Sequence, residues 1–333
     1  MPNLKSWLFI PVFLTPICAN AVSIYDNNIG AININMLTVD MMKNAQHSDN
    51  LSLFLRGKNL YGNMMRIDEY GDDGSTIDKT QNYKYVDILA QDIWADATYL
   101  NTRINYNDNL SDRSRLTMAS VGFDSIDVYL NNGSILFGAF WGYVGGRIAD
   151  FDTDGQTVGF FTKYTYQNLS ITGLIDTGAI NNDLQPYNFN DAWLNAAVDA
   201  SWKIRLNHMM YLQPTLYFGY THVTTDKNMR INGDLVTTNN FNFWNIAPSI
   251  TFVTQISDNW HGGAFFKYIH TNDGTNDIYF QNTKYTGLNL DNYSMVGINA
   301  EYRYNKFVFE STVTKQMGKY NGWDGNINAK YLF

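Results

Sequence analysis

Apolar and polar residues alternate along most of the chain from about residue 115 to the C-terminus. The closing stretch GNINAKYLF is the clearest case: every second residue from Ile327 to Phe333 is apolar, and those between are mostly polar. Successive side chains of a strand point to opposite faces. The pattern therefore predicts strands that separate two different environments.

Eleven such strands are expected from residue 115 onward, and residues 51–62 (LSLFLRGKNLYG) are expected to supply a twelfth, placed first. Short turns are expected at 131–134, 167–168, 206–209, 257–259 and 305–306, and longer polar loops at 150–155, 181–190, 224–240 and 272–290. Short connections on one side and long ones on the other are typical of outer-membrane barrels. Residues 63–114 are expected to be mainly a long loop, in which YVDILAQDIWADATYL suits a helix or an extra strand.

Composition supports a membrane barrel. Charged residues make up 16% of the chain and aromatic residues 15%, while the mean hydropathy is only −0.29. No apolar run approaches the roughly 18 residues of a membrane helix. A lipid-facing surface and a polar interior cancel in such an average. The fold class expected is all-β: a transmembrane antiparallel β-barrel of about 12 strands.

The N-terminus has the pattern of an export signal. Lys5 precedes the apolar stretch 7–18, and Ala19 and Ala21 form a small-x-small cleavage site, so the mature chain is expected to begin at Val22. Without Cys18 the mature chain has no cysteine, which excludes disulfides and thiol chemistry. We expect a signal peptide at 1–21, a short segment at 22–50 and the barrel domain at 51–333.

Residues 31–46 favour a helix just before the first strand. Ile34, Leu37 and Met41 fall at i, i+3 and i+7, the spacing of one apolar helix side. The ININ at its start also suits a strand.

Several stretches together resemble the C-terminal translocator domain of autotransporters. They are SVGFDS (120–125), LFGAFWGYVGG (136–146), YLQPTLYFGYTHV (211–223), AEYRYNKFVFEST (300–312) and the aromatic-terminated NAKYLF (328–333). The resemblance covers roughly residues 30 to 333. It implies a barrel of twelve strands with a short α-helix in the lumen, here within 31–46.

The resemblance also implies partners and roles. The family's terminal aromatic residue is recognised by the barrel-assembly machinery, a role that falls to Phe333, with Tyr331, Ala329 and Ile327 on the same face. A passenger domain would precede the helix, but only about ten residues separate Ala21 from it, so a very short or absent passenger is expected. Periplasmic chaperones and outer-membrane lipid or lipopolysaccharide are further expected partners. The barrel is expected to be a monomer.

Polar strand faces predict which side chains point into the lumen. The lumen-facing residues expected are Asp199, Lys203, Arg205, Glu301, Arg303, Glu310 and Lys330. Two interpretations stay open: charges that pair to avoid isolated burial, or a selectivity filter or helix-docking network.

Other chemistry has little support. The histidines (His47, His208, His222, His261 and His270) show no metal-ligand spacing, and DFDTDG lacks a complete calcium-loop pattern. No convincing Ser/His/Asp set is present, so no enzyme, cofactor or metal is expected. A net charge of −8 argues against nucleic acid.

The expected function is a translocator-like barrel in the outer membrane of a Gram-negative bacterium, with loops on the cell surface. The alternatives are a small porin-like channel and an adhesin that binds through long loops at 63–114, 224–240 and 272–290. A helix in the lumen would favour the translocator-like barrel over the porin-like channel, because a channel without such a helix would conduct ions.

Overall fold

The structure is a computed structural model that describes residues 92–107, 110–124, 128–130, 133–148, 151–184, 187–225, 230–231, 234–238, 240–273, 277–280, 283–286, 292–318 and 320–332. The expected signal peptide at 1–21, the segment at 22–50 with its helix at 31–46, the stretch at 51–62 and Phe333 lie outside the described residues.

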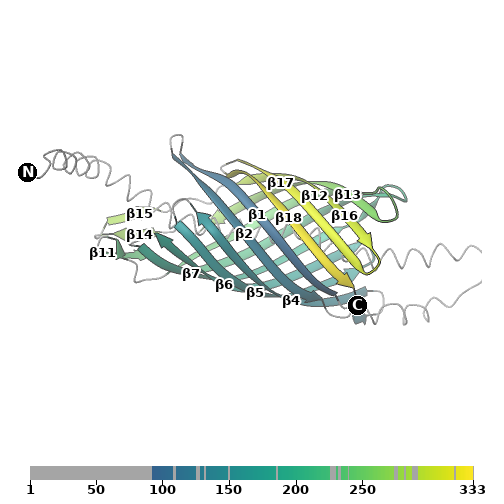
Figure 1. Ribbon diagram of the computed structural model, residues 1–333, viewed down its shortest axis with the longest axis horizontal. Helices are drawn as coiled ribbons and strands as arrows, with labels where there is room; N and C mark the ends of the chain where they lie inside the picture. The colour runs from purple at the N-terminus through teal and green to yellow at the C-terminus, as the bar shows by residue number, and fades with distance from the viewer. Residues whose placement is uncertain are drawn as a thin grey trace, which may run out of the picture.

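Twelve long strands form a closed antiparallel barrel, which confirms the expected fold class and strand number (Figure 1). They are β1 (Asp92–Asn107), β2 (Leu110–Asp124), β4 (Gly133–Ile148), β5 (Phe151–Tyr166), β6 (Leu169–Leu184), β7 (Tyr187–Trp202), β9 (Met210–Thr225), β12 (Phe241–Gln255), β13 (Trp260–Asp273), β16 (Tyr293–Tyr304), β17 (Phe307–Gly318) and β18 (Tyr320–Leu332). Two short strands, β3 (Val128–Leu130) and β8 (Ile204–Arg205), add to β4 and β9.

The barrel closes where its first strand meets its last. β1 pairs with β18 from Asp92 opposite Leu332 to Ile104 opposite Tyr320. Closure leaves the barrel wall without a free edge, which lipid requires because unpaired backbone groups cost several kcal/mol each there. The strands run obliquely around the barrel, as closure demands (Figure 1).

The first strand is not the one expected from the sequence. β1 at 92–107, rather than 51–62, stands beside β18, and 110–114 already belong to β2. The physical reason is that β1 lacks a clean alternation. Its inward face carries Trp94 and Leu100 among polar residues, and its outward face mixes Ile93 and Tyr99 with alanines.

Two of the expected loops are strand. Residues 151–155 open β5, and 181–190 form the ends of β6 and β7 with only 185–186 between them. Asp152, Asp154 and Asp183 on these strand ends are exposed. Runs of acidic residues favour a loop in the sequence. Strand ends that extend past an apolar belt can also carry charge, and these residues lie on such ends.

The outward faces carry a belt of exposed apolar side chains, for example Ile175, Leu216, Ile298 and Ile327 at 59%, 56%, 65% and 66% exposure. Aromatic residues mark both margins: Trp202, Trp260, Tyr304 and Phe307 near the short turns, and Tyr99, Tyr143, Tyr220 and Trp323 toward the other end. Such girdles are typical of membrane–water interfaces.

Short connections between long strands occur at both ends of the barrel, and the two longest connections share one end. Tight hairpins link β5 to β6 and β16 to β17, and Gln167 (φ 51°) and Asn305 (φ 53°) adopt left-handed backbone there. Asparagine tolerates this conformation better than most residues. The start of β1 and the end of β18 lie at this same short-turn end, since Asp92 pairs with Leu332.

At the other end, the two longest connections form a second sheet. Its strand order is β10 (Arg230–Ile231), β11 (Asp234–Thr238), β14 (Asp277–Phe280) and β15 (Thr283–Thr286). β11 pairs with β14, so the connection after β9 joins the one after β13. This small sheet lies at the end of the barrel away from the C-terminus (Figure 1).

Candidate functional site: the lumen of the barrel

The inward faces of the strands form a lumen wall that is polar and buried. Even short side chains are covered: Thr98 is 3% exposed, and Thr102, Ser114 and Thr314 are 0% exposed. The hydroxyl of Ser114 has no hydrogen-bond partner among the described residues. A wide water-filled channel would leave such side chains solvated, so the lumen wall is not lined by open solvent.

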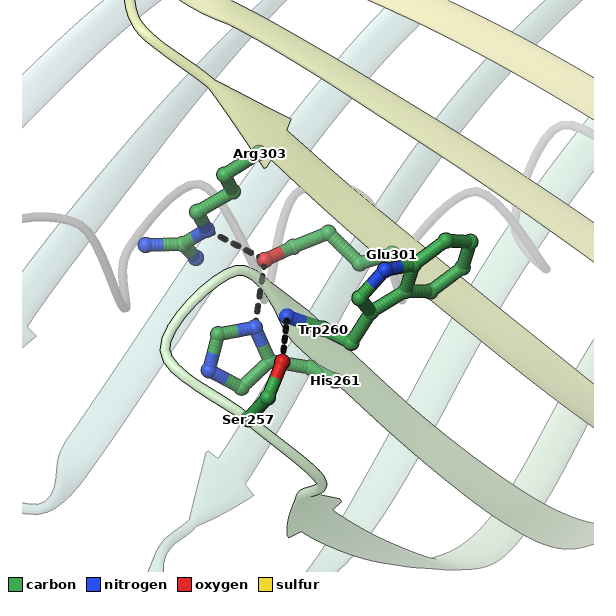
Figure 2. Close-up of polar contacts among 5 residues, drawn as sticks. All are labelled: Ser257, Trp260, His261, Glu301 and Arg303. Carbon is green, nitrogen blue, oxygen red and sulfur yellow. Dashed lines mark hydrogen bonds and ion pairs between the residues drawn. The ribbon is translucent and has the colours of Figure 1, made fainter.

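A charged cluster lies at the short-turn end, centred on Glu301 of β16 (Figure 2). Its carboxylate Oε1 lies 3.2 Å from His261 Nδ1 and also contacts the Arg303 guanidinium. Glu301 is 0% exposed and stands directly opposite Glu310 of β17. Like charges opposite each other repel, so the contacts with His261 and Arg303 offset the cost of this pair.

The same cluster fastens the turn between β12 and β13 to β16. The Trp260 amide donates to the carbonyl and to the hydroxyl of Ser257, at 3.3 and 3.2 Å. The Arg303 amide donates to the Asn259 carbonyl at 2.9 Å. Figure 2 shows this turn beside Glu301, so the turn and the ion cluster form one unit.

Lys203 and Arg205 lie beside this end of the barrel. Lys203 falls between β7 and β8, and its ammonium sits 4.4 Å from the centre of the Tyr211 ring. Burial lowers the pKa of Lys203 to about 8, and repulsion from Arg205 acts in the same direction. Arg205 itself is exposed and donates to the Asn207 carbonyl at 3.2 Å.

Further charges are paired on the lumen wall. Lys330 Nζ lies 3.7 Å from Asp124 Oδ2, and Trp94 Nε1 donates to the other Asp124 oxygen at 3.0 Å. Lys267 of β13 acts electrostatically on both Asp199 of β7 and Asp324 of β18. Because these strands stand on different parts of the wall, Lys267 reaches into the interior of the barrel.

Hydrogen-bond ladders join neighbouring strands along the same wall. Asn326 of β18 donates to Asp96 and Thr98 of β1, at 3.1 and 2.8 Å. Thr102 of β1 reaches Gln316 of β17 at 2.9 Å. Gly322 of β18 stands between them, and a Cβ there would lie 2.6 Å from Thr102 Oγ1. Because Gly322 has no side chain, Thr102 of β1 can hydrogen-bond to Gln316 of β17 across the intervening strand β18.

Asp176 accepts the hydrogen bonds of a third ladder, and removing its carboxylate is expected to lower the free energy of unfolding. Its carboxylate accepts from Trp193 Nε1 at 2.9 Å and from Asn195 Nδ2 at 2.7 Å. Asp176→Ala removes the acceptor of both buried donors, so we expect the free energy of unfolding to fall by about 2–4 kcal/mol. Urea unfolding of the refolded barrel measures it.

The matched control is Asp154→Ala, because Asp154 is exposed and its hydrogen bond among the described residues is a long one, from Asn181 at 3.4 Å. Its expected effect is within about 0.5 kcal/mol. Equal effects of the two substitutions would show that the Asp176 ladder contributes nothing particular to stability.

A band of buried apolar side chains also lines the lumen; we call it the apolar band. Ten strands each place one apolar side chain inward, none more than 2% exposed: Leu100, Leu116, Val144, Ile180, Trp193, Val223, Phe243, Ile269, Tyr293 and Tyr320. Leu100 is paired directly with Leu116, Trp193 with Val223, and Ile269 with Tyr293. The Tyr293 and Tyr320 rings lie edge to face at 4.8 Å. The band lies on the loop side of most charged lumen residues.

The seven residues that the sequence predicts to face the lumen differ from one another in burial. Asp199, Glu301, Glu310 and Lys330 are buried on inward faces, Arg303 and Lys203 are half-buried, and Arg205 is exposed in β8. The structure brings Glu301 and Arg303 together and places Lys330 with Asp124.

Sequence reasoning missed other lumen residues. The polar ones are Asp96, Asp124, Lys163, Asp176, His261, Lys267 and Asp324. The apolar band was also missed, since every apolar residue was read as lipid-facing. The signal that could reveal it is an apolar residue out of step with the alternation, such as Leu100 or Ile180.

His222 and His270 lie near the loop end, where their Nδ1 atoms contact Asn242 and Asn292. No group of three His, Cys, Asp or Glu side chains in the part of the chain that the structure describes is arranged to hold a metal ion.

Among the described residues, no helix has the length and apolarity needed to cross a membrane.

Solved structures with the same architecture include three autotransporter barrels. The β domain of the Bordetella autotransporter BrkA has a TM-score of 0.57 at 12% identity, covering 73% of this chain and all of that one. The translocator domain of NalP from Neisseria meningitidis has a TM-score of 0.58 at 10% identity, covering 84% and 97%. The transport unit of AIDA-I from Escherichia coli has a TM-score of 0.54 at 15% identity, covering 72% and 90%.

The fold is that of an autotransporter translocator barrel. The resemblance expected from the sequence is thereby confirmed at the level of the fold. No family model and no curated protein sequence matches the chain. The likeness accordingly lies in the fold, at 10–15% sequence identity.

Proposed function

We propose that this chain is a translocator-type outer-membrane barrel whose N-terminal segment occupies the lumen and is anchored or exported by it. The observation that carries the proposal is the buried lumen wall. Thr98, Ser114 and Thr314 are 3%, 0% and 0% exposed, although short side chains on a wall of twelve strands leave a central space. A segment within the lumen accounts for this burial, and residues 22–50 are the candidate.

The orientation follows from the two ends of the barrel. The start of β1 and the end of β18 lie at one mouth and the two longest connections at the other, the arrangement in which the first mouth faces the periplasm. The small sheet of β10, β11, β14 and β15 would then stand on the cell surface. A segment that precedes β1 enters the lumen from the periplasmic side.

An epitope tag placed directly after Ala21 tests this function. On intact cells we expect an antibody to detect the tag, because the segment in the lumen carries the N-terminus outward. A tag in the turn at Asn305–Lys306 is the control, since it should be detected only after permeabilisation. Detection of both tags only after permeabilisation would contradict export through the lumen and favour the channel alternative.

The assembly role proposed for the last strand draws on its outward face. Ile327 is 66% exposed, and the Tyr331 ring packs 5.1 Å from the Phe307 ring. This apolar and aromatic face, continued by Ala329, suits recognition by the barrel-assembly machinery after delivery by periplasmic chaperones, and we propose Phe333, which lies outside the described residues, as the terminal residue recognised. We propose that the barrel is a monomer without enzymatic activity.

A surface-binding role is the second candidate, favoured by the small sheet. Two connections far apart in the chain share backbone pairing between β11 and β14. Their pairing presents a defined surface rather than two separate loops. Deleting residues 277–286 should abolish such binding without unfolding the barrel, because these residues lie outside the closed barrel wall.

A further inference from the structure

Four arginines project from the outer wall of the barrel on three neighbouring strands. Arg103 lies on β1, Arg113 and Arg115 on β2, and Arg147 on β4, and all four side chains are exposed. They share the outward face with Tyr99 and Tyr143, since buried inward residues alternate with them. We call these four residues the arginine patch.

The patch places like charges directly opposite each other. Arg103 is the register partner of Arg113, and Arg115 that of Arg147. Such cross-strand pairs are destabilising unless an anion lies near. Two close pairs within three strands therefore point to an anionic ligand.

Among the described residues, the contacts of Arg113, Arg115 and Arg147 offset their charge only in part. Arg147 Nε lies 3.1 Å from Asp152 Oδ1, in a pair whose side chains are 60% and 72% exposed. The bond from Arg113 Nε at 2.7 Å goes to Asn101, which carries no charge. No ion pair is formed by Arg115 among the described residues. The acidic residues Asp152, Asp154 and Asp183 on β5 and β6 bound the patch on one side.

The patch lies just beyond the lipid-facing belt. Tyr99 and Tyr143 mark the belt margin at 49% and 44% exposure. Arg103 and Arg147 follow them by four residues on the same face, about 13 Å along each strand. At that level the headgroups of the surrounding leaflet meet the barrel, while their acyl chains lie along the apolar wall below.

We propose that the arginine patch binds the phosphate groups of a phosphorylated glycolipid in the outer leaflet. The inference rests on the orientation given under the proposed function, which turns this end of the barrel outward. Guanidinium groups match phosphate oxygens in paired hydrogen bonds, and several from adjacent strands can hold one headgroup. The patch borders the apolar wall of the barrel, so a bound lipid can also place its acyl chains against that wall. A free anion lacks this contact, and the site therefore favours a lipid.

The test titrates bisphosphorylated lipid A into the refolded mature chain held in phosphatidylcholine nanodiscs, with bound lipid counted by native mass spectrometry. Arg115→Gln should weaken binding about fivefold, and the triple variant R103Q/R113Q/R115Q on the order of one hundredfold. Lys306→Gln, an exposed cation at the short-turn end, is the matched control and should change nothing.

Three results of the binding experiment would overturn the proposal. The triple variant could bind as well as the unchanged chain, Lys306→Gln could weaken binding as much as Arg115→Gln, or excess inorganic phosphate could displace the lipid completely. The last would mark a site for free anions. In nanodiscs free of lipid A, the triple variant should be at least as stable as the unchanged chain, since repulsion is relieved; a large loss would show a purely structural role. Surface display of the N-terminal tag is independent of all these readouts.

Discussion

Arginine in place of Val313 is expected to lower the free energy of unfolding of the barrel by about 2–4 kcal/mol. Val313 lies in the middle of β17, is 48% exposed, and stands opposite Ile298, itself 65% exposed. Both belong to the outward apolar belt. A guanidinium at this depth must either lose its hydration or draw water into the lipid. Urea unfolding of the chain refolded into lipid vesicles measures the cost.

Met317→Arg is the matched control for this substitution. Met317 faces outward on the same strand and is 39% exposed, but it stands one residue from the strand end at Gly318. Near the interface an arginine reaches water, so the expected loss is about 0–1 kcal/mol. A loss at Met317 as large as that at Val313 would contradict the depth assigned to the belt. Loss at neither site would contradict a lipid-facing wall.

Much of the barrel could be predicted from the sequence because alternation survives where lipid and lumen differ sharply. In β16, Val296 and Ile298 face outward while Asn299 and Glu301 are buried. The strand count, closure and short turns follow from that contrast. It fails in β1, where Trp94 and Leu100 face inward and alanines face lipid. A strand with apolar residues on both faces resembles a loop or helix to this kind of reasoning.

The lumen was predictable only one strand at a time. Alternation can place Glu301 on a polar face, but it cannot bring His261 of β13 to within 3.2 Å of it, because register is set by the whole sheet. The same holds for Lys267, which acts on Asp199 and Asp324 from a third strand. The apolar band forms only when the register of ten strands brings one residue of each to the same level, so it cannot be predicted from any single segment.

The central claim is that a segment of the chain itself fills the barrel, and planar-bilayer conductance tests it most directly. The mature chain and a form lacking residues 22–50 are refolded and compared, with the faster migration of unheated samples on detergent gels as the control for folding. We expect the mature chain to conduct almost no current and the deletion to open a steady pore, since ions then meet a solvated lumen.

Equal and substantial conductance of the two forms would contradict the account and favour an open channel. Conductance near zero in both would equally contradict it, because the lumen would then be closed by the inward side chains of the barrel wall, the apolar band among them. A closed mature chain and an open deletion, both folded, are the result that the account predicts.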